Sequence, residues 1–218
     1  MAANRGDGIV APDGDERAVR IGVTGHRPVA LRGADVGLIR ARVREVFAAA
    51  RAAEVAGAGH LEVISPLAEG ADRLVAGEAI AAGLPLVCPL PFDRDSYAAD
   101  FKTVGSRAEY HALLAAAARV VELAGSRASP EAAYAAVGVW MLEHSDVLLA
   151  IWDGAAPRGE GGTGHVVRDA LARHIPVVWV QARPPHEVRI LTSAEDGVPV
   201  DEPLARLSQL LAVRDETR

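Results

Sequence analysis

Three short loops carry the residues whose types and spacing could bind a charged small molecule. One is the glycine-rich loop in "AIWDGAAPRGEGGTGHVVRDAL", which follows an apolar run ending at Trp152. Glycines let the backbone approach a ligand, and the amides at the start of the next helical pattern could hold phosphate. The alternative is a solvent loop in which Thr163 only caps the helix. The candidate residues are Asp153, Gly154, Arg158, Gly159, Gly161, Gly162 and Thr163.

A second loop, "TGHRP", follows the first apolar run of the chain. Its arginine could bind phosphate or carboxylate through paired N–H donors. The spacing is neither a GxGxxG dinucleotide fingerprint nor a P-loop, and the alternative is an ordinary turn with solvated side chains. The candidate residues are Thr24, Gly25, His26 and Arg27.

The third loop, "SPLAEGADR", leads into another helical pattern. The first amides of that helix are a second candidate anion site. Glu69 or Asp72 could instead accept ribose hydroxyls, and Asp72 could simply cap the helix. The candidate residues are Glu69, Gly70, Ala71 and Asp72.

Six apolar runs alternate with helical patterns and must position these loops. Each run is continuous rather than alternating, which favours strands buried on both faces of a parallel sheet. The pattern predicts a doubly wound, mostly parallel α/β sheet with helices on both faces, of Rossmann-like type, in a single domain. In such sheets ligands bind beyond the carboxyl ends of the strands, where all three loops lie. Strands are expected at 20–24, 61–65, 84–88, 119–123, 147–152 and 175–180.

Helices are expected between these strands, and the chain ends are expected to be tails. Residues 18–213 form the predicted domain, between a disordered tail at 1–17 and a short tail at 214–218. The proline-rich stretch 181–203 is interpreted as a surface excursion. The helical patterns cover residues 36–50, 71–82, 106–118, 131–143, 164–174 and 202–213.

Composition excludes several classes of protein. The 218 residues carry a net charge of −6 without a basic stripe, which argues against nucleic acid as a partner. The single cysteine, Cys88, excludes a disulfide framework and lies in an apolar run typical of the core. No apolar stretch reaches the length of a membrane span, and the first residues lack a signal peptide's apolar region. We therefore expect a cytoplasmic protein without a membrane partner.

The three loops together resemble the SLOG superfamily. "ISPLAEGADRLVAGEAIAAGLPLVCPLP" resembles the strand–loop–helix–strand of DNA-processing protein A. "SDVLLAIWDGAAPRGEGGTGHVVRDALARHIPVVWV" resembles the lonely-guy (LOG) proteins, and "IGVTGHRP" completes the match over about residues 20–181. The resemblance implies a Rossmann-like fold, a nucleotide-related ligand and a homodimer. Some members cleave nucleoside 5′-monophosphates to free base and ribose 5-phosphate, whereas others sense nucleotide-derived signals.

The sequence departs from the LOG enzymes where their chemistry is done. Their motif is Gly-Gly-x-Gly-Thr-x-x-Glu, and aligning its Gly-Thr with Gly162-Thr163 puts Val166 in place of the catalytic glutamate. The helix that should carry their arginine reads "VWMLEHSD". A nucleotide-binding protein or sensor is therefore the leading hypothesis. The alternatives are a nucleotide N-glycosidase using Asp153 or Glu160, and handling of single-stranded DNA.

The segment "FDRDSYAADF" offers further candidates beside the third strand. Asp93, Asp95 and Asp100 could hold Mg²⁺ together with a diphosphate ligand, although a solvated lid is the favoured interpretation. Tyr97 or Tyr134 could stack on a base, or pack in the core. The binding hypothesis itself requires no cofactor.

Overall fold

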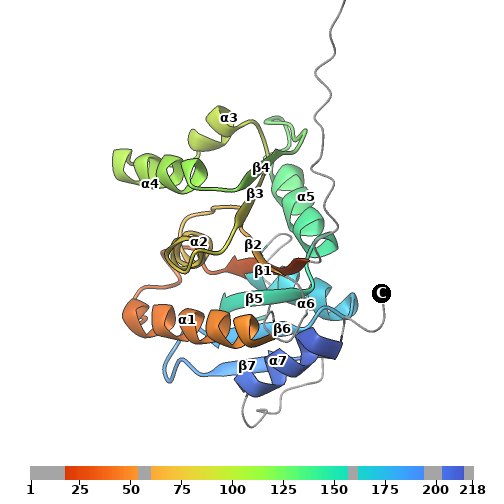
Figure 1. Ribbon diagram of the computed structural model, residues 1–218. Helices are drawn as coiled ribbons and strands as arrows, with labels where there is room; N and C mark the ends of the chain where they lie inside the picture. The colour runs from red at the N-terminus through yellow and green to blue at the C-terminus, as the bar shows by residue number, and fades with distance from the viewer. Residues whose placement is uncertain (1–17, 54–59, 157–161, 194–202, 214–218) are drawn as a thin grey trace, which may run out of the picture.

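Seven strands form one sheet in the order β4-β3-β2-β1-β5-β6-β7 (Figure 1). The computed structural model describes residues 18–53, 60–156, 162–193 and 203–213. The first six strands run parallel, and β7 pairs antiparallel with β6 at one edge. The strands are β1 (Ala18–Gly25), β2 (His60–Ile64), β3 (Leu86–Leu90), β4 (Arg119–Glu122), β5 (Val147–Trp152), β6 (Val177–Gln181) and β7 (Val188–Leu191).

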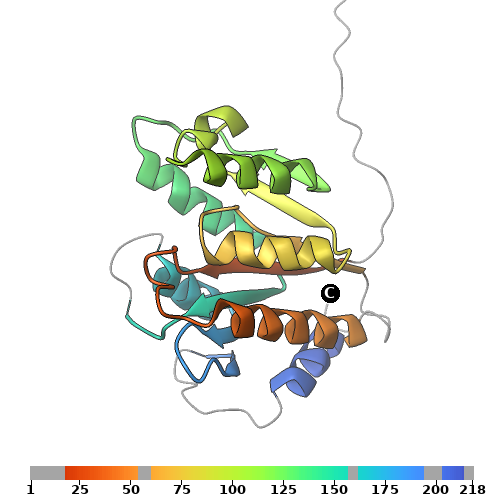
Figure 2. The ribbon, with the colours of Figure 1, turned by 90° about the vertical axis from the view of Figure 1, so that its left-hand side faces the viewer.

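Helices cover both faces of this sheet. Figures 1 and 2 show α1, α2 and α4 on one side and α5 and α6 on the other. The architecture is the doubly wound, mostly parallel Rossmann-like sheet that the sequence predicts. The helices are α1 (Val36–Ala53), α2 (Ala71–Ala81), α3 (Arg94–Ala98), α4 (Val104–Ala115), α5 (Pro130–Glu143), α6 (Thr163–Ala172) and α7 (Pro203–Val213).

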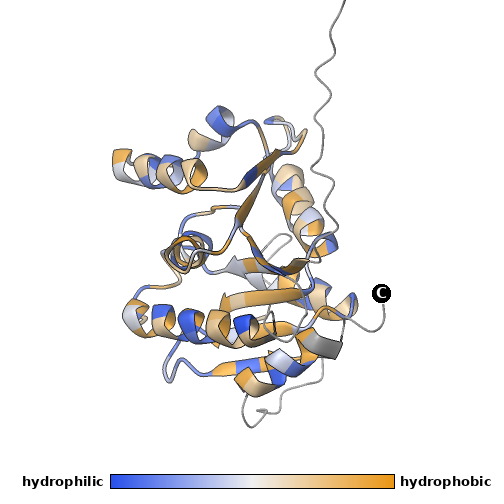
Figure 3. Cartoon of the chain, viewed as in Figure 1, coloured by the Kyte–Doolittle hydropathy of each residue, from blue (hydrophilic) through white to orange (hydrophobic). Residues whose placement is uncertain are grey.

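The continuous apolar runs of the sequence form the inner strands, whose side chains are buried on both faces of the sheet. All five residues of β3 are buried, as are five of the six in β5, because helices pack on both faces. Figure 3 shows the inner strands as mostly apolar, whereas α1 carries hydrophilic residues on one side. Two clusters of buried side chains result, one on each face of the sheet.

Two elements correct the expectations from sequence. The stretch after residue 181, expected as a surface excursion, contains β7, which pairs with β6 from Val188 to Leu191. The "FDRDSYAADF" segment is not a solvated lid. It forms α3, and Phe92, Tyr97 and Phe101 are 1–3% exposed within it.

The expected tails at 1–17 and 214–218 lie outside the described residues, so they stay predictions. Within the part of the chain that the structure describes, no helix has the length and apolar character to cross a membrane.

Candidate functional site

A cavity of about 330 Å³ lies at the point where the strand order reverses. From β1, the chain builds the sheet outward through β2 to β4 on one side and through β5 to β7 on the other. The loops after β1 and β5 therefore diverge, and the crevice between them is where open α/β sheets bind ligands. The cavity volume is within the range of small-molecule sites.

The end of β1 and the loop after it line the cavity with all four of their candidate residues. Thr24 is buried within β1, whereas the Arg27 side chain is exposed. A Cβ on Gly25 would lie 2.4 Å from the Ala71 Cβ, so this turn packs directly on the start of α2. The His26 amide donates to the Ile151 carbonyl at 3.0 Å, which ties the loop to β5.

His26 and Asp153 both line the cavity and contact each other. The His26 Nε2 lies 3.1 Å from the Asp153 amide nitrogen and 3.0 Å from the Asp153 Oδ1. One tautomer of the imidazole accepts from the amide, and the other donates to the carboxylate. Burial acts to raise the pKa of Asp153, but the Ala155 amide and His26 outweigh it and hold that pKa below its ordinary value. Asp153 therefore presents an ionised carboxylate to the cavity.

The start of α6, which follows the glycine-rich loop in the sequence, lies at the same cavity. Gly162, Thr163 and Gly164 line it, and no side chain of the described residues caps the helix there. Its first amides are therefore open to an anion. Gly154, with a φ of 81°, packs near Trp179 and does not line the cavity. The remaining candidates of this loop, Arg158, Gly159 and Gly161, lie outside the described residues, as does Glu160.

Of the four candidates around the start of α2, only Asp72 lines the cavity, together with Pro66 and Ala68 of the preceding loop. The first amide of α2, that of Ala71, donates to the His26 carbonyl at 3.0 Å and is therefore not available to an anion. Gly70 packs on the same carbonyl and does not line the cavity either. Glu69 faces away and accepts a hydrogen bond from the Ser106 hydroxyl of α4. Ribose recognition by Glu69 thus has no support from its position.

Asp72 is the most perturbed carboxyl in the cavity. It lies in the first turn of α2 and is 7% exposed. Burial raises the pKa of Asp72 from 3.8 to about 7, against the charges of Arg27 and Arg73 and a hydrogen bond from the Ala68 amide. The cavity thus contains two carboxyls whose pKa values are displaced in opposite directions.

Helices α3 and α5 supply an aromatic and apolar wall. Tyr134 hydrogen bonds to Asp100 at 2.6 Å and packs edge-on against Phe92. Tyr97 also lines the cavity, but it is 3% exposed and packs edge-on against neighbouring rings. Both tyrosines are candidates from the sequence, whereas three further α5 residues that line the cavity are not. These are Val137, Gly138 and Met141.

The three aspartates around α3 do not converge on a metal site. Asp93 caps α3 by accepting from the Ser96 amide at 2.9 Å, and Asp100 pairs with Arg127 at 2.7 Å. Across the described ranges, no group of three or more His, Cys, Asp and Glu side chains is arranged to hold a metal ion. Binding of Mg²⁺ with a diphosphate ligand stays a prediction.

Comparison with known proteins gives likenesses of fold alone. No protein-family model and no curated protein matches the chain. The structure of TM1055, a structural genomics target, aligns with a TM-score of 0.44 at 19% identity, covering 73% of this chain and 72% of that one. DNA processing protein A from Helicobacter pylori, described for its single-stranded DNA binding mode, aligns at 0.46 and 15% identity, covering 79% and 69%.

DNA processing protein A from Streptococcus pneumoniae aligns with a TM-score of 0.49 at 12% identity. The alignment covers 88% of this chain but 56% of that longer chain. All three structures are similar to this chain in fold.

Proposed function

We propose that this chain binds a nucleotide or a nucleotide-derived ligand in the cavity between the loops after β1 and β5. The observation that carries the proposal is the open start of α6, which faces the same cavity as the exposed Arg27. Amides at a helix start and a guanidinium are a common combination for phosphate. The resemblance of the three loops to SLOG proteins points to the same ligand class.

The other groups that line the cavity could contact the ribose and the base of a nucleotide. Asp153, ionised and fixed by His26, is placed to accept ribose hydroxyls. Tyr134 and the α5 wall supply an apolar surface for a base. In this arrangement the phosphate occupies the α6 start, and the ligand extends from there across the ends of β5 and β1.

Thermal shift with AMP, ADP, ATP, ADP-ribose, NAD, cyclic nucleotides and ribose 5-phosphate tests the proposal. A ligand that binds only the folded state raises the melting temperature by mass action. Gly162→Asp places a carboxylate at the α6 start and should weaken binding at least about tenfold through like-charge repulsion. Gly105→Asp is the matched control, because Gly105 lies in the first turn of α4 with open space around it. Unchanged affinity in Gly162→Asp would overturn the phosphate placement.

A second candidate, hydrolysis of the N-glycosidic bond, is favoured by the ionised Asp153 carboxylate in the cavity. A carboxylate can stabilise the oxocarbenium-like centre that forms as the bond to the base breaks. Water then adds to the sugar carbon, and the base leaves with a proton.

Chromatography of each incubated mixture separates the two candidates. Free base that appears with wild type and not with Asp153→Asn identifies the hydrolase. An intact nucleotide in a stabilised complex identifies a binding protein. A single-stranded oligonucleotide at low salt tests the third hypothesis, since binding through phosphates should appear there and weaken with salt.

A further inference from the structure

A closed circuit of contacts joins four side chains beside the cavity. The Tyr134 hydroxyl donates to the Asp100 Oδ2 at 2.6 Å, and the Arg127 Nη1 donates to the Asp100 Oδ1 at 2.7 Å. The Arg127 guanidinium lies 4.0 Å from the centre of the Phe92 ring, and Phe92 packs edge-on against Tyr134 with 5.8 Å between the ring centroids. Both oxygens of one carboxylate thus hold a tyrosine and an arginine in fixed positions.

The circuit connects segments that are distant in the sequence. Phe92 follows β3, Asp100 follows α3, Arg127 precedes α5, and Tyr134 lies near the start of α5. Arg127 also donates to the Ser96 carbonyl of α3. Its ion pair with Asp100 is partly exposed and by itself stabilises the fold little. Its structural effect is to fix the point at which the tyrosine hydroxyl is bound, and with it the orientation of the ring.

The Tyr134 ring is the part of the circuit that borders the cavity. Tyr134 lines the cavity, whereas the other three side chains of the circuit do not. Its hydroxyl is bound to Asp100, so the side chain presents its ring rather than its polar end to a ligand. Gly138 and Met141, one and two turns further along α5, continue the same cavity-lining stripe.

Tyr97, the other tyrosine of the cavity, offers less of its ring. It is 3% exposed and packs edge-on against both Phe101 and Tyr110, as a core residue does. Tyr134 is half-buried, and among the described residues Phe92 is the aromatic ring that contacts it. One edge-on neighbour covers at most one face of a ring. Tyr134 therefore keeps ring surface on which a planar ligand can stack.

Tyr134 lies one turn before the point where α5 meets α6. Each of these helices follows a parallel strand and so begins at the carboxyl edge of the sheet, and Figures 1 and 2 show both on one face. A Cβ on Gly138 would lie 3.7 Å from the Val166 Cγ2 of α6. One turn nearer the edge are Tyr134 on α5 and Thr163 on α6, and both line the cavity. Because packed helices lie about 8–10 Å apart, a nucleotide with its phosphate at the α6 start has its base within reach of the ring.

We propose that Tyr134 selects ligands with a planar base over sugar phosphates, and that Asp100 and Arg127 are positioning residues that hold its ring at the cavity. This inference rests on the proposed function, since it assumes that a phosphate occupies the start of α6. It adds to that function the residue on which the base stacks and two residues that act through it. Stacking on an aromatic ring tolerates every base, so the ligand class is a nucleotide of any base.

The test compares AMP with ribose 5-phosphate, which lacks the base. Calorimetric titration gives the affinity for AMP, and competition with AMP gives that for ribose 5-phosphate. Wild type should bind AMP about tenfold more tightly. Tyr134→Leu keeps an apolar side chain without a ring, so its affinity for AMP should fall toward that for ribose 5-phosphate. Its affinity for ribose 5-phosphate should stay unchanged, because this ligand does not reach the ring.

Three further variants test the positioning role. Tyr134→Phe keeps the ring without its anchor, and Asp100→Ala removes the anchor itself. Each should weaken AMP binding by about threefold and leave ribose 5-phosphate binding unchanged, and the double variant should lose no more than either single variant. Asp95→Ala is the matched control, because it removes an exposed carboxylate from the first turn of α3, and it should bind both ligands as wild type does.

The outcomes separate this inference from the proposed function. Wild type that binds AMP no more tightly than ribose 5-phosphate would overturn the inference alone. So would a Tyr134→Leu variant that keeps its full affinity for AMP or loses affinity for both ligands by the same factor. Additive losses in the double variant would show that Asp100 does not act through Tyr134. If neither ribose 5-phosphate nor any nucleotide binds, the proposed function and this inference fail together.

Discussion

At the scale of single residues, Gly70 controls how two of the cavity loops meet. Its backbone has a φ of 101° and a ψ of −124°, a conformation that residues with a Cβ avoid. A Cβ there would lie 2.4 Å from the His26 carbonyl oxygen. The same carbonyl accepts from the Ala71 amide, so the turn at Gly70 lets α2 begin against the loop after β1.

Gly70→Ala should therefore both destabilise the fold and damage the cavity. The strained φ and the clash with backbone, which cannot move aside cheaply, should lower the free energy of unfolding by about 3 kcal/mol. Urea denaturation measures this change, and nucleotide affinity should fall with it because His26 and Arg27 are displaced.

Gly83→Ala is the matched control, because Gly83 also has a positive φ, 69°, but has open space where the Cβ would lie. Its cost should stay near 1 kcal/mol, the usual price of a left-handed residue with a side chain. Equal losses in the two variants would show that the contact with His26 contributes nothing.

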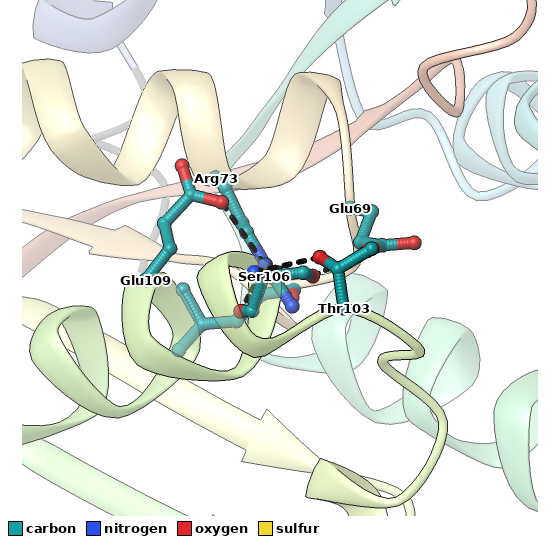
Figure 4. A network of polar contacts seen from close by, with 6 residues as sticks. Glu69, Arg73, Thr103, Ser106 and Glu109 are labelled. Carbon is teal, nitrogen blue, oxygen red and sulfur yellow. Dashed lines mark hydrogen bonds and ion pairs between the residues drawn. The ribbon is translucent and has the colours of Figure 1, made fainter.

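At the scale of elements, Arg73 holds α4 against α2. Figure 4 shows its side chain between the two helices, with Glu69, Ser106 and Glu109 around it. It donates to the Leu67 carbonyl at 3.0 Å and to the Ser106 carbonyl at 2.8 Å, and its guanidinium lies 4.1 Å from the centre of the Phe101 ring. Arg73 thus joins α2 to the loop before it, to Phe101 in the segment after α3, and to α4.

Arg73→Met should lower the free energy of unfolding by about 3 kcal/mol, measured by urea denaturation. The variant keeps much of the apolar stem but leaves two buried carbonyl oxygens without their donor. Glu109→Gln removes only the ion pair, whose acidic partner is 58% exposed, and should change stability by less than about 1 kcal/mol. If Arg73→Met costs no more than this control, the guanidinium does not hold the helices together.

The elements that the sequence predicts well are those with a strong apolar pattern. The run at Val147–Trp152 is β5 to the residue, because both of its faces are buried. The edge strand β7 has only four residues, includes Arg189 and follows a proline pair, so its pattern resembles a loop. Helix α3 is too short, at five residues, to show helical periodicity.

Some residues of the candidate site could likewise be predicted from the sequence pattern, and others could not. Loops that directly follow strands, such as Thr24–Arg27, were placed correctly because the carboxyl ends of parallel strands share one edge. The wall from α5 could not be predicted, since this helix is apolar nearly all round and its pattern does not say which face turns inward. The orientation of Glu69 toward Ser106 depends on α4, which is distant in sequence.

At the scale of the whole molecule, the buried carboxyl of Asp72 makes the stability of the folded chain depend on pH. Its pKa rises from an ordinary 3.8 to about 7 in the folded chain. Between these two values the folded chain holds a proton that the unfolded chain has released. The free energy of unfolding therefore falls as pH rises through this interval and levels off above about pH 7. Burial of this carboxyl therefore lowers the stability of the folded chain at neutral pH.

Asp72→Asn should relieve this cost, since its amide does not ionise. The stability gained over wild type should grow by about 3 kcal/mol between pH 5 and pH 8, because each unit of pKa displacement is equivalent to about 1.4 kcal/mol. Urea denaturation of both proteins at the two pH values measures the difference. Asp93→Asn is the control: hydrogen bonds from Ser96 hold the pKa of Asp93 below its ordinary value, so the difference in stability between this variant and wild type should stay constant from pH 5 to pH 8. A stability difference between Asp72→Asn and wild type that stays constant from pH 5 to pH 8 would mean that Asp72 is ionised in the folded chain throughout this range.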